Sequence, residues 1–148
     1  MTKEHQIKVQ EEEQQIDLLT TQFFDLFTNT NGRIPTVQNI KTLFLPDGIL
    51  INNTTGTPAV YDLEGFIQPR EEILTNGTLT AFTEQETAHT TTIFGNIAQR
   101  ACTYEKSGLW NGEPFKGTGK KLMQFIKQED QWFLAAVTWS DQPEPSKK

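Results

Sequence analysis

The stretch FGNIAQRACTYE, residues 94 to 105, carries several reactive side chains at alternate positions. A two-residue turn at positions 95 and 96 would pair residues 79–94 with residues 97–106 as antiparallel strands. Because side chains alternate between the faces of a strand, this register puts Arg100, Cys102 and Tyr104 on one face with His89. Tyrosine and histidine exchange protons, and arginine binds anions. The hairpin therefore predicts a chemically active face.

The same register has consequences for the neighbouring residues. It pairs Thr87 with Tyr104 and sends Glu86 to the opposite face of the sheet. By the same alternation Trp132 and Trp139, seven positions apart, should lie on opposite faces of the last strand, one in the core and one at a cavity or a subunit contact.

Arg100 has two interpretations at this stage. It can bind an anionic ligand, or it can form a structural ion pair with a carboxylate such as Asp25 or Asp47. The acid–base interpretation assigns proton transfer to His89, Tyr104 and Asp47, although both His89 and Tyr104 also suit ordinary hydrogen-bonded packing positions. The predicted ligand-pocket residues are Arg100, Cys102, Phe24, Phe66 and Trp139.

The composition narrows the classes of function. The 148 residues suit one domain at 15–141, between a polar extension at 1–14 and a polar tail at 142–148. A net charge of −6 without a basic stripe argues against nucleic-acid binding. The single cysteine and the two distant histidines predict no disulfide and no metal site. No cofactor motif, signal sequence or membrane span is recognised, so we expect a cytoplasmic protein without a cofactor.

Helical and strand patterns follow one another along the chain. Apolar spacing predicts a helix that begins near Ile16 and ends before TNTNGRIP, a short helix at 37–44, and a third at 63–74 capped by Asp62. A turn at 46–48 precedes a short strand. Long β patterns follow at 79–94, 97–106, 116–128 and 132–140, with SGLWNGEP as a loop. We expect an α+β fold in which three N-terminal helices pack on a strongly bent antiparallel sheet and leave a conical cavity.

Four segments resemble the nuclear transport factor 2-like superfamily, which has a cystatin-like α+β cone. They are FFDLF, FLPDGILI, FGNIAQRACTYE and GTGKKLMQFIKQEDQWFLAAVTWSDQ. The chain is most similar to the SnoaL-like or DUF4440-like branch over residues 16–141. The resemblance implies a homodimer formed through the sheet face. This sequence departs from the family pattern at three positions: Arg100, where an aliphatic residue is usual, Cys102, where serine is commoner, and Lys121, near an asparagine position. If these residues face the cavity, they make it more cationic than in the relatives.

Activities in this superfamily include isomerase-like, dehydratase-like, epoxide-hydrolase-like and polyketide-cyclase-like chemistry, and they share a cavity rather than one catalytic set. We therefore expect a small organic ligand held in the cone, with an anionic compound as one option. The alternatives are a cofactor-independent acid–base enzyme and an interaction module that acts through its sheet. Among the carboxylates, Asp25, Asp47 and Asp62 are the candidates for a base.

Overall fold

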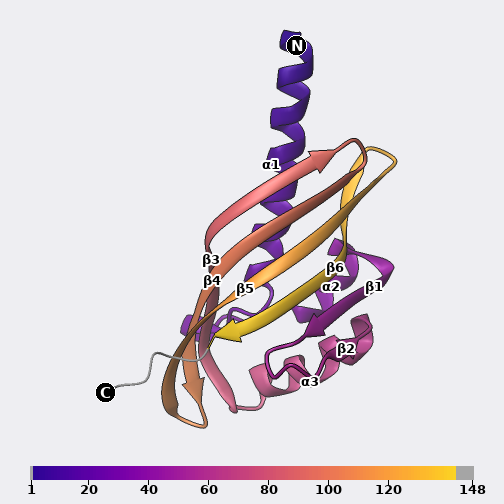
Figure 1. Cartoon of the computed structure of the whole chain (residues 1–148). Coiled ribbons are helices and arrows are strands. Elements are labelled where there is room, and N and C mark those ends of the chain that lie inside the picture. The colour runs from indigo at the N-terminus through magenta and orange to yellow at the C-terminus, as the bar shows by residue number, and fades with distance from the viewer. Residues whose placement is uncertain (1, 143–148) are drawn as a thin grey trace.

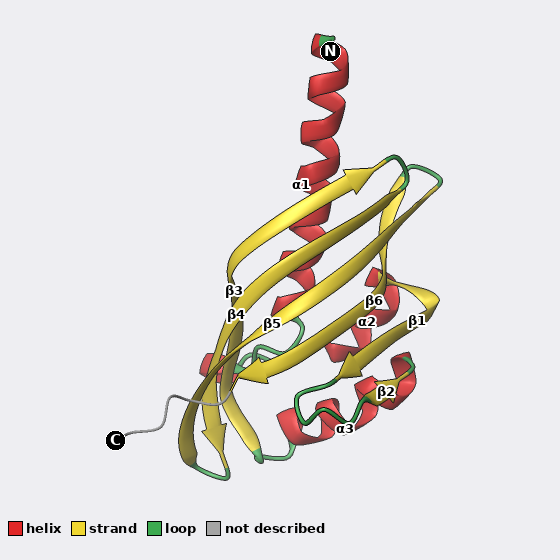
Figure 2. Cartoon of the chain, viewed as in Figure 1, coloured by secondary structure: helices red, strands yellow, loops and turns green. Residues whose placement is uncertain are grey.

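The computed structural model describes residues 2–142, which form an α+β fold (Figures 1 and 2). The helices are α1 (Lys3–Asp25), α2 (Ile40–Leu43) and α3 (Leu63–Thr75), with two short 3₁₀ turns, η1 (Thr30–Gly32) and η2 (Val37–Asn39). The strands are β1 (Phe44–Asn52), β2 (Ala59–Tyr61), β3 (Leu79–Phe94), β4 (Ile97–Trp110), β5 (Glu113–Gln128) and β6 (Gln131–Gln142). The predicted α+β class is confirmed.

One curled sheet contains all six strands, in the order β2-β1-β6-β5-β4-β3. Strands β3 to β6 form an antiparallel meander, whereas β1 pairs with β6 in parallel. Buried side chains of the three helices form a single core with one face of this sheet. That face is concave, and α1 runs along it with its first turns projecting past the strand ends (Figure 1).

The hairpin register is correct near the turn and wrong farther along. Phe94 pairs with Ile97 and His89 with Cys102, as predicted. A β-bulge at Thr87 then shifts the pairing, so that Glu86, not Thr87, lies opposite Tyr104. An extra residue in one strand reverses the alternation beyond it. Glu86 therefore lies on the concave face, contrary to the prediction.

A second β-bulge, in β6, places Trp132 and Trp139 differently from the prediction. Gln124 pairs with Ala136 and Phe125 with Leu134, which leaves Ala135 as the extra residue in β6. Trp132 is buried in the core, and Trp139 packs against the same core from the concave face. The prediction of opposite faces is wrong because it assumed unbroken alternation.

Element boundaries also differ from the sequence predictions. The predicted loop SGLWNGEP is instead the end of β4, a tight turn and the start of β5, and the turn residues Asn111 and Gly112 have positive φ angles of 49° and 84°. Residues 46–48 lie within an irregular part of β1, and the predicted helix at 37–44 is a 3₁₀ turn followed by α2. Helix α1 already begins at Lys3, so the described part of the polar extension is helical.

The third helix agrees with its prediction. The Asp62 side chain caps α3 by accepting a hydrogen bond from the Gly65 amide at 2.7 Å.

Within residues 2–142, no helix is long and apolar enough to cross a membrane. The cytoplasmic location stays a prediction.

Candidate functional site

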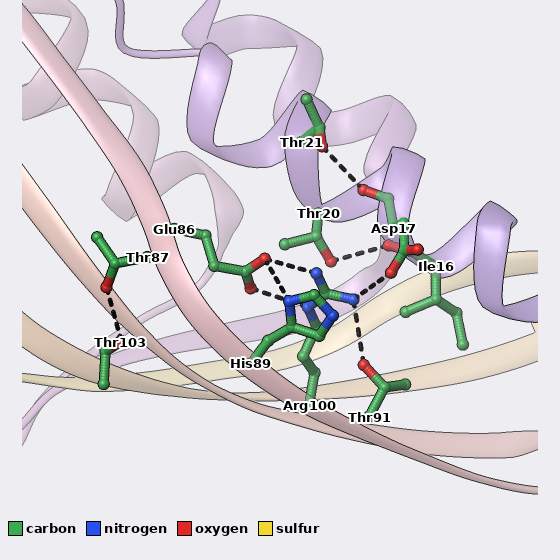
Figure 3. Close-up of polar contacts among 10 residues, drawn as sticks. All are labelled: Ile16, Asp17, Thr20, Thr21, Glu86, Thr87, His89, Thr91, Arg100 and Thr103. Atoms are coloured by element: carbon green, nitrogen blue, oxygen red, sulfur yellow. Dashed lines mark hydrogen bonds and ion pairs between the residues drawn. The ribbon is translucent and has the colours of Figure 1, made fainter.

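Arg100 lies at the centre of a closed ion-pair cluster between α1 and the sheet (Figure 3). Only 2% of its side chain is exposed. Its Nε and Nη2 donate to the two carboxylate oxygens of Glu86 at 2.9 and 2.6 Å, and Nη1 donates to Asp17 at 2.6 Å and to the Thr91 hydroxyl at 3.1 Å. Burial would lower the pKa of Arg100, but the hydrogen bonds that it donates to Glu86 and Asp17 outweigh this effect and raise that pKa.

The structural ion-pair interpretation thus accounts for Arg100, although with different partners from those predicted. Glu86 reaches the arginine because the bulge at Thr87 turns it inward. Asp25 instead pairs with Arg33 on the surface, and Asp47 lies on an exposed part of β1. With its donors engaged by protein groups, Arg100 has little capacity left for a ligand.

The predicted catalytic residues are not brought together. His89 lies at the outer side of the Arg100 cluster, with 44% of its side chain exposed and Nδ1 3.1 Å from Glu86. Asp47 borders a separate shallow depression beside Ile126 and Ala135. Tyr104 is buried under the sheet, and burial together with a hydrogen bond to Asp141 raises its pKa. These positions do not form a common proton-transfer site.

Two predicted pocket residues, Cys102 and Phe24, do not line the cavity that contains Phe66 and Trp139. Cys102 is buried, and burial, reinforced by the nearby Glu86 carboxylate, raises the pKa of its thiol to about 12. A thiol with so high a pKa is a poor nucleophile at neutral pH. Phe24 is buried beside Tyr104 and borders a shallow groove between α1 and β3.

A cavity of about 290 Å³ lies elsewhere, between α3 and the concave face of β3 to β6. Residues from α1, α3, β1 and all four long strands contribute to its wall. Phe66 and Trp139, both predicted as pocket residues, are among them, with ring centroids 5.8 Å apart. Its aromatic wall consists of Phe23, Phe27, Phe66, Phe82, Trp110, Phe115 and Trp139.

One side of this cavity carries a chain of charged and hydroxyl groups. The Tyr104 hydroxyl donates a hydrogen bond to Asp141, whose carboxylate also lies 3.0 Å from Lys106 Nζ. Burial would raise the pKa of Asp141, but Tyr104 and Lys106 outweigh that effect and lower it. Asp141 is therefore an ionised hydrogen-bond acceptor at neutral pH.

The Lys121 ammonium lies among aromatic rings on the same side of the cavity as Asp141. Its Nζ lies 3.9 Å from the Tyr104 ring centroid and 5.4 Å from that of Trp139. It also lies 3.4 Å from Glu84, and the residue is only 5% exposed. The expectation that Lys121 adds positive charge to the cavity therefore agrees with its position in the wall.

Gly119 makes room for the Tyr104 hydroxyl. A Cβ atom at Gly119 would overlap that hydroxyl and would approach the Ser140 carbonyl oxygen to 2.7 Å. The absence of a side chain thus permits the hydrogen bond from Tyr104 to Asp141.

Arg70 reaches the cavity from α3. Its guanidinium carbon lies 3.7 Å from the Phe66 ring centroid, 5.2 Å from that of Tyr61 and 5.7 Å from that of Trp139. One main-chain contact accompanies this stacking, from Nη1 to the Phe66 carbonyl oxygen at 3.4 Å. Burial lowers the pKa of Arg70, and more weakly acting neighbours, Tyr61 foremost, offset it only in part.

Sequence reasoning missed Arg70, Glu84 and Asp141. Two of them had a usable signal: Arg70 is four residues after Phe66 on the same helix face, and Asp141 is two residues after Trp139 on the same strand face. Glu84 had no such signal, because irregular pairing between Thr80 and Thr83 precedes it.

Across residues 2–142, no group of three or more histidine, cysteine or acidic side chains is arranged to hold a metal ion.

Comparison with solved structures identifies the class of fold. A nuclear transport factor 2-like superfamily protein from Salmonella enterica superposes with a TM-score of 0.73 at 14% identity, over 93% of this chain and 96% of that one. An uncharacterised protein with a cystatin-like fold from Caulobacter vibrioides gives 0.68 at 14% identity, over 90% and 92%. A Nostoc punctiforme protein with a cystatin-like fold gives 0.67 at 15% identity, over 89% and 92%.

The chain therefore has the nuclear transport factor 2-like, cystatin-like fold that its sequence resembles. No protein-family model matches the sequence. No curated protein matches it either. The narrower resemblance to the SnoaL-like or DUF4440-like branch stays a prediction.

Proposed function

We propose that this chain binds a small organic molecule in the cavity between α3 and the concave face of the sheet. The observation that carries the proposal is the wall itself, in which aromatic rings surround a space approached by a few convergent polar groups. Ligand sites typically combine an apolar wall with a small number of placed polar groups. At roughly 30 Å³ for one liquid water, a volume of 290 Å³ corresponds to a ligand of about ten non-hydrogen atoms.

Binding is better supported than the acid–base alternative. The two carboxylates in the wall, Glu84 and Asp141, each contact a lysine. A general base works best when its pKa lies near the operating pH, and the pKa of Asp141 is shifted downward, away from it. Catalysis by His89, Tyr104 and Asp47 lacks a shared site for a substrate.

A crystal structure of the protein purified from its own host tests the proposal. We expect ordered density beside Phe66 and Trp139. Titration with small aromatic compounds, followed by NMR chemical shifts, provides a second readout. An Ile73→Trp variant should fill the cavity and abolish the shifts, whereas Ile34→Trp, at a position 78% exposed and outside the cavity, should leave them unchanged. Absence of density and of shifts in the unmodified protein would contradict the proposal.

We also propose that two copies associate through the outer face of the sheet. Support comes from Leu122, which points outward from β5 with 57% exposure and lies between Ala101 and Thr138 on the neighbouring strands. Light scattering should give the mass of a dimer, which Leu122→Glu should convert to a monomer. Val60→Glu, at an exposed position on β2, is the matched control. A monomeric unmodified protein would contradict this arrangement.

A further inference from the structure

The charges in the cavity wall do not balance. Three cations, Arg70, Lys106 and Lys121, face two carboxylates, Glu84 and Asp141, which leaves one positive charge. This local excess stands out in a chain whose net charge is −6. One bound anion would therefore neutralise the excess positive charge of the wall.

The unbalanced cation is Arg70. Lys106 pairs with Asp141 at 3.0 Å and Lys121 with Glu84 at 3.4 Å. Among residues 2–142, no carboxylate forms an ion pair with Arg70, although Glu84 and Asp141 attract it from a greater distance. Its polar contacts are the Phe66 carbonyl oxygen, at 3.4 Å, and the Tyr61 hydroxyl. A partly desolvated guanidinium without an ionic partner is costly unless something else supplies the negative charge.

The stacking of Arg70 on Phe66 determines which part of the guanidinium can bind a ligand. The guanidinium lies 3.7 Å from the centre of the Phe66 ring, so one of its faces is covered. Its polar contacts with the Phe66 carbonyl oxygen and the Tyr61 hydroxyl use only part of its five N–H groups, and the others remain for a ligand. Two parallel N–H groups of a guanidinium match the two oxygens of a carboxylate. The aromatic rings of Phe66 and Trp139 extend the same surface and suit a flat apolar body.

The remaining groups disfavour a more highly charged ligand. A phosphate monoester carries about −1.5 to −2 charges at neutral pH. Glu84 and Asp141 would repel that second charge, and the two lysines that could offset it already pair with these carboxylates. A single negative charge matches the single excess positive charge.

We propose that Arg70 binds the carboxylate group of a small ligand whose flat apolar body packs against Phe66 and Trp139. The assignment rests on the proposed function, because it requires the cavity to be a ligand site. It adds the ligand's chemical class, a monocarboxylate, and the residue that selects it.

Matched acid and amide probes test the assignment. Benzoate and phenylacetate are titrated against the intact protein by calorimetry, alongside benzamide and phenylacetamide, which have similar shapes without the charge. We expect each acid to bind at least about tenfold more tightly than its amide, which corresponds to about 1.4 kcal/mol. Arg70→Met should remove that preference. Arg33→Met, at an exposed arginine outside the cavity, should retain it.

The outcomes separate the two proposals. Equal binding of acids and amides would leave the cavity as a ligand site and overturn the carboxylate assignment. Tighter binding of phenyl phosphate than of benzoate would overturn it too. Failure of all probes at millimolar concentration, with no shift in the NMR titration, would overturn both proposals. Because acids and amides are compared in the unmodified protein first, the test does not depend on a variant that folds.

Discussion

The protein contains two largely buried arginines whose surroundings are opposite in kind. Arg100 is held by two carboxylates and a hydroxyl in a closed cluster between α1 and the sheet (Figure 3). Arg70 stacks on aromatic rings at a cavity and has no carboxylate partner among the described residues. A buried charge whose partners are all supplied by the protein contributes to stability, whereas the lack of an ionic partner at Arg70 is the basis of the proposed ligand contact.

The largest expected effect comes from Arg100→Leu. Removal of the arginine strands the mostly buried carboxylate of Glu86, so the free energy of unfolding should fall by about 3–5 kcal/mol. Urea denaturation measures this. Arg33→Leu, which breaks an exposed ion pair, should cost less than about 1 kcal/mol.

A double variant separates the stranded charge from lost packing. Replacing both Arg100 and Glu86 by leucine should recover part of the lost stability, because no buried charge is left without a partner. A loss below about 1 kcal/mol for Arg100→Leu alone would show that the cluster is not a structural element, and the contrast with Arg70 would disappear.

A smaller effect is expected at the acidic side of the cavity. Gly119→Ala should force the Tyr104 hydroxyl away from Asp141 and reduce stability by about 1–3 kcal/mol. Gly117→Ala is the control, because its Cβ would meet only the flexible side chain of Lys106, with Cε at 3.1 Å. Similar losses in the two variants, measured by thermal unfolding, would mean that Tyr104 does not depend on the space above Gly119.

The pH dependence of stability should report on Asp141. Its pKa is lowered in the folded state, so its contribution is fully present above the unfolded value of about 3.9 and is lost as the pH falls through the folded value. Urea titrations at pH 7, 5 and 3 should show Asp141→Asn less stable than the unmodified protein at pH 7 and 5, with a smaller gap at pH 3. Asp130→Asn, in an exposed turn, should show little difference throughout. A gap for Asp141→Asn that grows toward acid pH would contradict this sign.

The smallest change in stability is expected for Arg70→Met. No carboxylate is stranded, and loss of the stacked cation is offset by removal of a desolvated charge, so the free energy of unfolding should change by less than about 1 kcal/mol. Urea denaturation without added ligand measures it. If Arg70→Met lowered the free energy of unfolding as much as Arg100→Leu does, both arginines would stabilise the fold and the contrast between them would be wrong.

The fold class and most of the secondary structure could be predicted from the order and spacing of residues along the chain. Period-two and helical patterns were sufficient for α3 with its Asp62 cap, for the hairpin turn after Phe94 and for the order of the four long strands. These features depend on local backbone preferences and on the pattern of apolar side chains, both of which can be read from residues close together in the sequence.

Which residues contact one another could not be predicted in this way, because it depends on how the strands pair in the folded protein. The bulges at Thr87 and Ala135 reversed the side-chain alternation and brought Glu86 to Arg100 and Trp139 to the cavity. A single extra residue in a strand has almost no signature in the sequence but redirects every side chain beyond it. The contrast between Arg100 and Arg70 likewise depends on partners distant in sequence, because Asp17 reaches Arg100 from α1, whereas no carboxylate within residues 2–142 forms an ion pair with Arg70.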